Sequence, residues 1–153
     1  MNFNQRVSNP MLVGTIELCK EEDTPEHREM LEDEIVKATF LSPILIDPEP
    51  EKNESGGIIV KQGSKLQFPS LTAQNGARFF MAFTDRMELE KSGHKEDYHE
   101  AALNFADYMV MLFKNDPQNA YAGFVINPYG GNIVLPKDIV MALYMKQNAK
   151  KGI

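Results

Sequence analysis

Residues 123–136 constrain the fold more than any other stretch of the sequence. Two short apolar runs, 123–126 and 133–136, flank a cluster of Asn, Pro, Tyr and Gly residues. Apolar runs separated by such turn residues are typical of a β-hairpin. The stretch therefore predicts a strand, a tight turn, a second strand and then the start of a helix.

Two glycine pairs, Gly56-Gly57 and Gly130-Gly131, need to be weighed as possible phosphate-binding loops. Neither pair is followed by Gly-Lys and Ser or Thr, and neither opens a dinucleotide-binding fingerprint. Glycine also permits the positive φ angles that tight turns require. We therefore interpret both pairs as hairpin geometry, and the sequence predicts no cofactor.

Two antiparallel helices are expected near the N-terminus, joined by a short acidic turn. Asn9-Pro10 and Thr24-Pro25 each place a capping residue before proline in the first helical position. The first helix is expected to end near residues 21–23. The second is expected to bury one apolar stripe and to expose an acidic face. The stripe is Met30, Leu31, Ile35 and Ala38, and the acids are Glu29, Glu32, Asp33 and Glu34.

The middle of the chain carries mainly strand and turn signals. Residues 40–46 are β-rich, but Pro43 predicts either an edge strand or a strand that begins after the proline. Residues 49–57 are expected to form an exposed, mobile loop. Asn75-Gly76 is the strongest short hairpin signal, because both residues tolerate positive φ. The other expected strands are 58–60, one from Leu66 to Leu71 through Pro69, 78–83 and 99–103.

Three further helices are predicted, and together with the strands they define the fold class. Thr84-Asp85 can cap a short helix that contains Met87 and Leu89. The helix at 104–115 carries Phe105, Tyr108, Met109, Leu112 and Phe113. Val110 and Met111 lie on its far side, so this helix is expected to be buried over much of its circumference. The last helix starts at Pro136 and is expected to bury Ile139, Leu143 and Tyr144. Interleaved hairpins and helices predict a single α+β domain with a mostly antiparallel sheet.

Composition excludes several classes of partner. The chain has 16 basic and 22 acidic residues, and its net charge of -6 repels phosphate backbones, which disfavours nucleic acid. Its longest apolar runs fall far short of the roughly 20 residues that a membrane-spanning helix needs. Cys19 is the only cysteine, which fits a reducing compartment. The expected partner is a protein or a small ligand, and homo-oligomerisation is left open.

The residue types that could support catalysis do not form a recognisable motif. Cys19 lies on the apolar side of a predicted helix and is followed by acids, which raise a thiol pKa, so we interpret it as half-buried and structural. His94 and His99 are too awkwardly spaced to share one face of a helix or strand, so no metal site is predicted. The alternative hypothesis is an uncharacterised hydrolase or sulfur-related enzyme that uses Asp85, His94, Asp97 and His99.

Nine methionines are many for a chain of 153 residues. Four of them, Met109, Met111, Met141 and Met145, fall on the last two predicted helices. Helically spaced methionines usually fill a core, but methionine also repacks easily against varied partners. The sequence therefore leaves open whether these helices form core or an interface.

An ordered set of short motifs carries a resemblance to a known family. The set comprises Asn9-Pro10-x-Leu12, Phe68-Pro69-x-Leu71 with Gly76, Phe80-x-x-Phe83-Thr84-Asp85, Gly123-x-Val125-Ile126-Asn127-Pro128 and Val134-Leu135-Pro136. Together these motifs resemble the N-terminal domain of the SseB family. The resemblance implies a cytoplasmic bacterial protein with an α+β fold and supplies no catalytic residues. It also implies one domain over residues 1–153, with its core at about 9–147 and no second, C-terminal domain.

The preferred functional hypothesis is a non-enzymatic binding or regulatory module. Rigid strands would display polar and aromatic groups near the end of the strand at 78–83 and at the tip of the 123–136 hairpin. The residues expected to form this surface are Thr84, Asp85, Asn127 and Tyr129. Asn127 could equally do no more than form the turn before Pro128.

Overall fold

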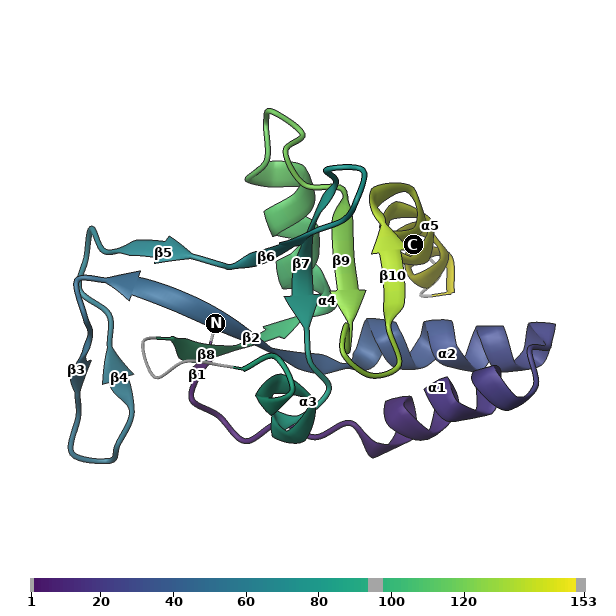
Figure 1. Ribbon diagram of the computed structural model, residues 1–153, viewed down its shortest axis with the longest axis horizontal. Helices are drawn as coiled ribbons and strands as arrows, with labels where there is room; N and C mark the ends of the chain where they lie inside the picture. The colour runs from purple at the N-terminus through teal and green to yellow at the C-terminus, as the bar shows by residue number, and fades with distance from the viewer. Residues whose placement is uncertain (1, 94–97, 151–153) are drawn as a thin grey trace.

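A computed structural model describes residues 2–93 and 98–150 (Figure 1). The helices are α1 (Pro10–Glu21), α2 (Pro25–Lys37), α3 (Arg86–Glu90), α4 (Phe105–Met109), the π-helix η1 (Val110–Lys114) and α5 (Lys137–Lys150). One sheet has the order β1 (Asn2–Phe3), β8 (His99–Asn104), β2 (Thr39–Asp47), β5 (Lys65–Gln67). The other has the order β10 (Ile133–Pro136), β9 (Gly123–Ile126), β7 (Arg78–Ala82), β6 (Ser70–Thr72). A ribbon of β3 (Glu51–Lys52) and β4 (Ile58–Ile59) completes the described strands.

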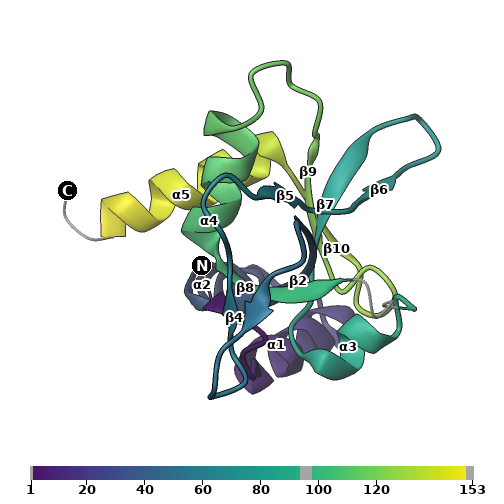
Figure 2. The same ribbon diagram turned by 90° about the vertical axis from the view of Figure 1, so that its left-hand side faces the viewer.

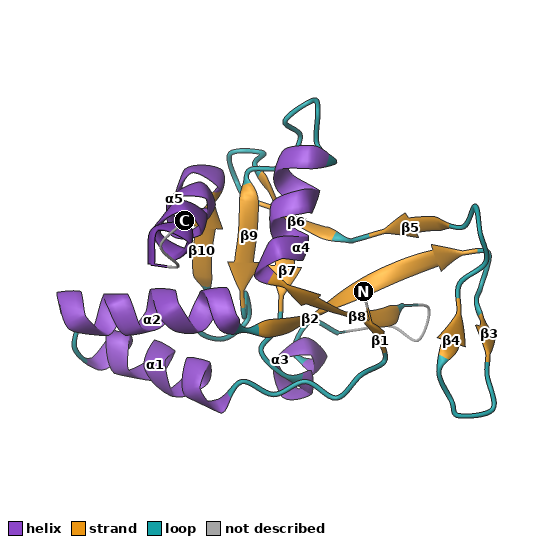
Figure 3. Cartoon of the chain, turned by 180° about the vertical axis from the view of Figure 1, so that it is seen from behind, coloured by secondary structure: helices purple, strands orange, loops and turns teal. Residues whose placement is uncertain are grey.

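The arrangement of these elements confirms the α+β prediction. In the part of the chain that the structure describes, β7 and β9 run parallel and the other strand pairs are antiparallel. Seen from behind, α4 and α5 lie over the second sheet and α2 crosses below them (Figure 3). Strands β2 and β5 extend away from the helices toward the β3–β4 ribbon (Figure 1), which faces the viewer in Figure 2. The predicted helix pair and C-terminal helix are therefore present.

The hairpin at 123–136 forms as predicted. Strands β9 and β10 pair antiparallel from Ile133 opposite Ile126 to Pro136 opposite Gly123. Its glycine pair has a different role from the one predicted, because positive φ occurs at Asn127 (49°) and Asn132 (53°), not at Gly130 or Gly131. A Cβ on Gly130 would lie 2.1 Å from Glu88 Oε1, and one on Gly131 would lie 2.9 Å from Ile16 Cγ2. These glycines make room for α3 and α1 against the turn.

Strand β2 corrects the prediction made from Pro43. The strand neither stops nor starts at this proline but runs through it between two neighbouring strands. Glu100, opposite Pro43, directs its backbone N–H and C=O to Asn4 instead of to β2. The position where Pro43 lacks an N–H therefore faces the opposite edge of β2. On that edge, Leu41 pairs with Phe83 and Leu45 pairs with β5, so residue 43 lies between the two pairings. A proline fits there without costing a ladder hydrogen bond.

Two middle segments also differ from expectation. Residues 49–57 contain strand β3 and a tight turn in which the Asn53 side chain accepts hydrogen bonds from the N–H groups of Ser55 and Gly57. The strand predicted through Pro69 is divided into β5 and β6, which belong to different sheets. The Asn75-Gly76 turn is confirmed, with φ of 86° at Gly76.

The helices mostly begin and end where the capping residues predict. The Thr24 hydroxyl caps α2 by accepting a hydrogen bond from His27 N–H, and Asn104 and Asp107 form a reciprocal capping box on α4. Which side of each helix is buried was predicted less well. Met30, Ile139 and Tyr144 are exposed, whereas Val140 is buried. Phe113, which lies on the π-helical turn, is also exposed.

One core connects the two sheets. Tyr108, from α4, stacks on Phe124 of β9 at 4.3 Å between ring centroids, and both rings meet Phe40 of β2 edge-on. The Tyr108 hydroxyl donates a hydrogen bond to the Met81 carbonyl, and burial raises the pKa of this phenol well above its usual value. Helices and both sheets thus share the same buried aromatic cluster.

Candidate functional site

Thr84 and Asn127 form a buried pair beneath the predicted binding surface. Asn127 Oδ1 accepts a hydrogen bond from the Thr84 N–H at 3.0 Å, and Asn127 Nδ2 donates to Thr84 Oγ1 at 2.9 Å. The exposed fractions of the two residues are 0% for Thr84 and 4% for Asn127. Thr84 therefore exposes nothing at the surface, and Asn127 contributes only a small part of the cleft described below. They fix the turn after β9 to the end of β7.

Asn9 extends this support to the first helix. Its side chain makes no helix-cap hydrogen bond, although the sequence predicts it as an N-cap. Its Nδ2 instead donates to the carbonyl oxygens of Thr39 and Thr84, each at 2.8 Å. One amide thus ties the start of α1 to β2 and to the junction between β7 and α3. The Asn-Pro pattern predicts a helix start but carries no signal for this long-range contact.

Asp85 lies at the centre of the surface above this network. It caps α3 by accepting a hydrogen bond from Glu88 N–H at 2.9 Å through Oδ1, and its Oδ2 accepts one from Thr84 Oγ1 at 3.0 Å. The residue is half-buried and lines three surface hollows, of about 550, 450 and 470 Å³. The structure therefore brings together three of the predicted residues, Thr84, Asp85 and Asn127. Hydrogen bonds connect them at the place where α1, α3 and the hairpin meet.

The hollow of about 450 Å³ is a cleft between α1, α3 and the turn of the 123–136 hairpin. Gly130 and Gly131 line one side of it, and Glu88 and Lys91 form an ion pair on α3. The side chain of Met87 projects beside it with an exposed fraction of 76%. The other lining residues are Val13, Ile16, Glu17, Lys20, Asp85 and Asn127.

The two other hollows adjoin this cleft and share Asp85 with it. The one of about 470 Å³ runs along the outer face of α1 and shares Val13, Glu17 and Asp85 with the cleft. The one of about 550 Å³ lies between the N-terminal segment and α3, where Arg86 Nη1 meets the buried Glu100 carboxylate at 2.6 Å. Tyr129 is exposed on the hairpin turn but lines none of the three hollows.

Of the four residues in the alternative, enzymatic hypothesis, the structure describes two, Asp85 and His99. His94 and Asp97 lie outside the described residues. His99 Nε2 lies 2.7 Å from Glu49 Oε1, whereas the Asp85 carboxylate caps α3, so these two residues have separate partners. Within residues 2–93 and 98–150, no three His, Cys, Asp or Glu side chains are grouped to hold a metal ion.

The interpretation of Cys19 is confirmed. The thiol is half-buried and donates a weak hydrogen bond to the His27 carbonyl at 3.3 Å between Sγ and O. Burial raises the pKa of Cys19, and the nearby Asp23 carboxylate raises it further. A thiol with a raised pKa holds little of the nucleophilic thiolate at neutral pH.

Comparison with known proteins decides the family. A model of the SseB protein N-terminal domain matches residues 12–142, which covers most of the chain and every described strand except β1. The chain belongs to the SseB N-terminal domain family. No curated protein and no solved structure matches it. Among the described residues of this SseB domain, no helix combines the length and the apolar character needed to cross a bilayer.

Proposed function

We propose that this SseB domain is a binding or regulatory module whose contact surface is centred on Asp85. The observation that carries the proposal is the meeting of three hollows at this residue. Beneath them, the amides of Asn9 and Asn127 and the Thr84 hydroxyl tie α1, β2, β7 and the hairpin together. A surface held in place before binding loses less conformational freedom when a partner arrives.

Exposed methionines favour a protein or peptide partner over a single tightly defined small molecule. Met87 lines two of the hollows, and Met11, also exposed, lies on α1. Large exposed apolar side chains cost solvation energy unless a partner covers them, and methionine adapts its shape to different partners. The net charge of -6 favours a basic partner. A cytoplasmic location remains the expectation that the family resemblance implies.

A peptide selection with matched methionine variants tests this proposal. Twelve-residue peptides displayed on phage are selected on the immobilised chain, and the enriched peptides are synthesised for affinity measurements. We expect Met87→Asp to weaken their binding by about tenfold or more, because burying a new carboxylate is costly. Met145→Asp is the control, because Met145 is also an exposed methionine but lies on α5. Equal affinities for wild type and Met87→Asp would remove the Asp85 surface as the binding site.

A further inference from the structure

Gly14 has no explanation in the packing of its own chain. It lies in the middle of α1, where glycine is less favourable than alanine because of its greater backbone freedom in the unfolded state. It is exposed, and a Cβ built on it would meet no atom within 4 Å. In contrast, a Cβ on Gly123 would lie 2.1 Å from the Leu135 carbonyl oxygen. Gly14 therefore keeps open a space that nothing in the described chain fills.

That space lies within the surface groove along α1. Pro10, Val13, Gly14 and Glu17 follow one another at helical spacing and line the hollow of about 470 Å³. This hollow shares Val13, Glu17 and Asp85 with the neighbouring cleft, so the two form one groove from the start of α1 to the hairpin turn. Figure 1 places α3 next to the N-terminal end of α1.

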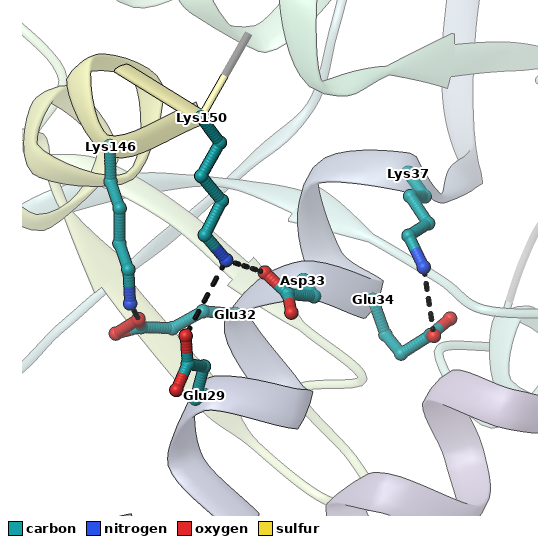
Figure 4. A network of polar contacts seen from close by, with 7 residues as sticks. All are labelled: Glu29, Glu32, Asp33, Glu34, Lys37, Lys146 and Lys150. Carbon is teal, nitrogen blue, oxygen red and sulfur yellow. Dashed lines mark hydrogen bonds and ion pairs between the residues drawn. The ribbon is translucent and has the colours of Figure 1, made fainter. Parts of the chain in front are cut away.

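Three charged groups along the groove take part in no ion pair. Among the described residues, neither Glu17 nor Asp85 forms an ion pair with a cation, and Lys20 forms none with an anion. The acids on the neighbouring helix α2 differ, because Lys146 and Lys150 of α5 pair with three of them (Figure 4). Besides the Glu88–Lys91 ion pair, the groove thus presents two carboxylates, Glu17 and Asp85, where its two hollows meet, and one ammonium group about a helical turn further along α1.

We infer that this groove binds a basic, apolar segment of a partner protein, with the segment's backbone passing over Gly14. A Lys or Arg of the segment lies between Glu17 and Asp85, and small apolar residues contact Val13 and Met87. An acidic residue of the segment, about one helical turn from the basic one, meets Lys20. The inference rests on the proposed binding function and specifies the chemistry of the partner. Absence of a side chain on Gly14 is what allows the close approach of the two backbones.

The decisive variant is Gly14→Ala, because it acts on folding and on binding in opposite directions. Alanine removes the helix penalty of glycine and meets no neighbour, so the thermal midpoint should rise by about 1–4 °C. Its methyl group should obstruct the segment and weaken the binding of selected basic peptides by about tenfold or more. Loss of binding in a more stable protein cannot be attributed to unfolding. Glu21→Ala, at the C-terminal end of the same helix, is the control and should leave affinity unchanged.

The charge on the segment is tested with the same displayed peptides. Peptides enriched on the full wild-type chain should carry Lys or Arg beside small apolar residues. Glu17→Gln should weaken them roughly 2–5-fold and should reduce the loss of affinity between low and high salt. If enriched peptides are acidic, or bind Gly14→Ala as well as wild type, the inference is overturned, although loss of binding in Met87→Asp would still support the proposed function. If no peptide is enriched, both are contradicted.

Discussion

Asn127 performs two tasks that few other residues combine. Its backbone adopts φ of 49°, in the left-handed region that asparagine tolerates better than most residues, and its carbonyl accepts hydrogen bonds from Gly130 and Asn132. Its buried side-chain amide both donates to and accepts from Thr84. The turn and its attachment to β7 therefore depend on one side chain, which sequence patterns predict only as a turn former.

Asn127→Ala separates these two tasks when it is compared with Asn132→Ala. Asn132 has φ of 53° but is exposed, so its replacement should cost only the left-handed backbone penalty, about 1 kcal/mol. Asn127→Ala should cost about 2–4 kcal/mol, because Thr84 also loses its buried partners. Urea denaturation of both variants measures the difference. Equal losses would show that the contact with Thr84 contributes nothing.

Two hairpin glycines should differ sharply in their tolerance of alanine. A Cβ on Gly123 meets the Leu135 carbonyl oxygen of the backbone, so Gly123→Ala must separate β9 from β10. A Cβ on Gly130 meets only the end of the flexible Glu88 side chain, which can move. We expect Gly123→Ala to destabilise the fold by more than about 2 kcal/mol and Gly130→Ala by less than about 1 kcal/mol. Thermal unfolding of the two variants compares them, and the reverse order would contradict the close approach at Gly123.

At the scale of elements, α5 is held to the domain by two kinds of contact. Val140 and Leu143 are buried in the core, whereas Lys146 and Lys150 pair with acids of α2 on the surface (Figure 4). A hydrogen bond from Lys150 lowers the pKa of Asp33. Exposed ion pairs are screened by salt and contribute little, so the apolar contacts dominate.

This division predicts how two α5 variants respond to salt. Leu143→Ala should lower the free energy of unfolding by about 2–5 kcal/mol at any salt concentration. The double variant Lys146→Gln and Lys150→Gln should lower it much less, and only at low salt. Denaturation at low and at 1 M NaCl distinguishes them. A large loss in the lysine variant that persists at 1 M NaCl would show that the ion pairs, and not the core contacts, hold α5.

The loop before β9 is organised by the buried carboxylate of Asp116. Burial alone would raise its pKa, but hydrogen bonds from the N–H groups of Tyr121 and Ala120 and from the Lys137 ammonium outweigh this effect and lower it. A carboxyl whose pKa is lowered by folding stabilises the fold above its unfolded pKa, about 3.9. That contribution is lost as the pH falls through the lower, folded value.

Asp116→Asn should therefore cost about 1–3 kcal/mol at pH 7 through its weakened hydrogen bonds. The difference in unfolding free energy between wild type and variant should shrink as the pH falls below about 4. Urea denaturation of both proteins at pH 7, 5, 4 and 3 gives the difference at each pH and cancels the titration of other groups. A difference that stays constant down to pH 3 would mean that the Asp116 pKa is not lowered by folding.

Local sequence signals predicted elements well and their partners poorly. The start of α2, the Asn75-Gly76 turn and the 123–136 hairpin depend on neighbouring residues, so the sequence contains their causes. The separation of β5 and β6 into different sheets depends instead on strands far away in the chain. The same holds for Pro43, whose tolerance in β2 depends on where β5 begins to pair.

The candidate site was predictable to a similar extent. Thr84, Asp85 and Asn127 follow strand ends, so their meeting could be expected from the sequence. Their burial could not, because α1 is brought over them by tertiary packing through Asn9. The groove on α1 was missed for the same reason. A mid-helix glycine such as Gly14 was the one local signal available, and it becomes informative only once its surroundings are known.

At the scale of the whole molecule, two buried clusters each join residues of both four-stranded sheets, which predicts one unfolding transition. The larger cluster includes residues of both four-stranded sheets, such as Leu103 of β8 and Leu135 of β10. Each of Leu103→Ala and Leu135→Ala should lower stability by about 2–5 kcal/mol and shift the entire transition without changing its dependence on denaturant. Far-UV and near-UV circular dichroism should report the same midpoint. Two separate transitions would show that the sheets unfold independently.

The pairing of β1 with β8 also bears on how the chain is made. Asn2 lies opposite Ala102, so the two partners are 100 positions apart in the sequence. At about 5–20 residues per second, a ribosome needs roughly 5–20 s to synthesise the second partner after the first. Throughout that interval β1 has no strand to join. Completion of the first sheet is therefore a late event in the synthesis of the chain.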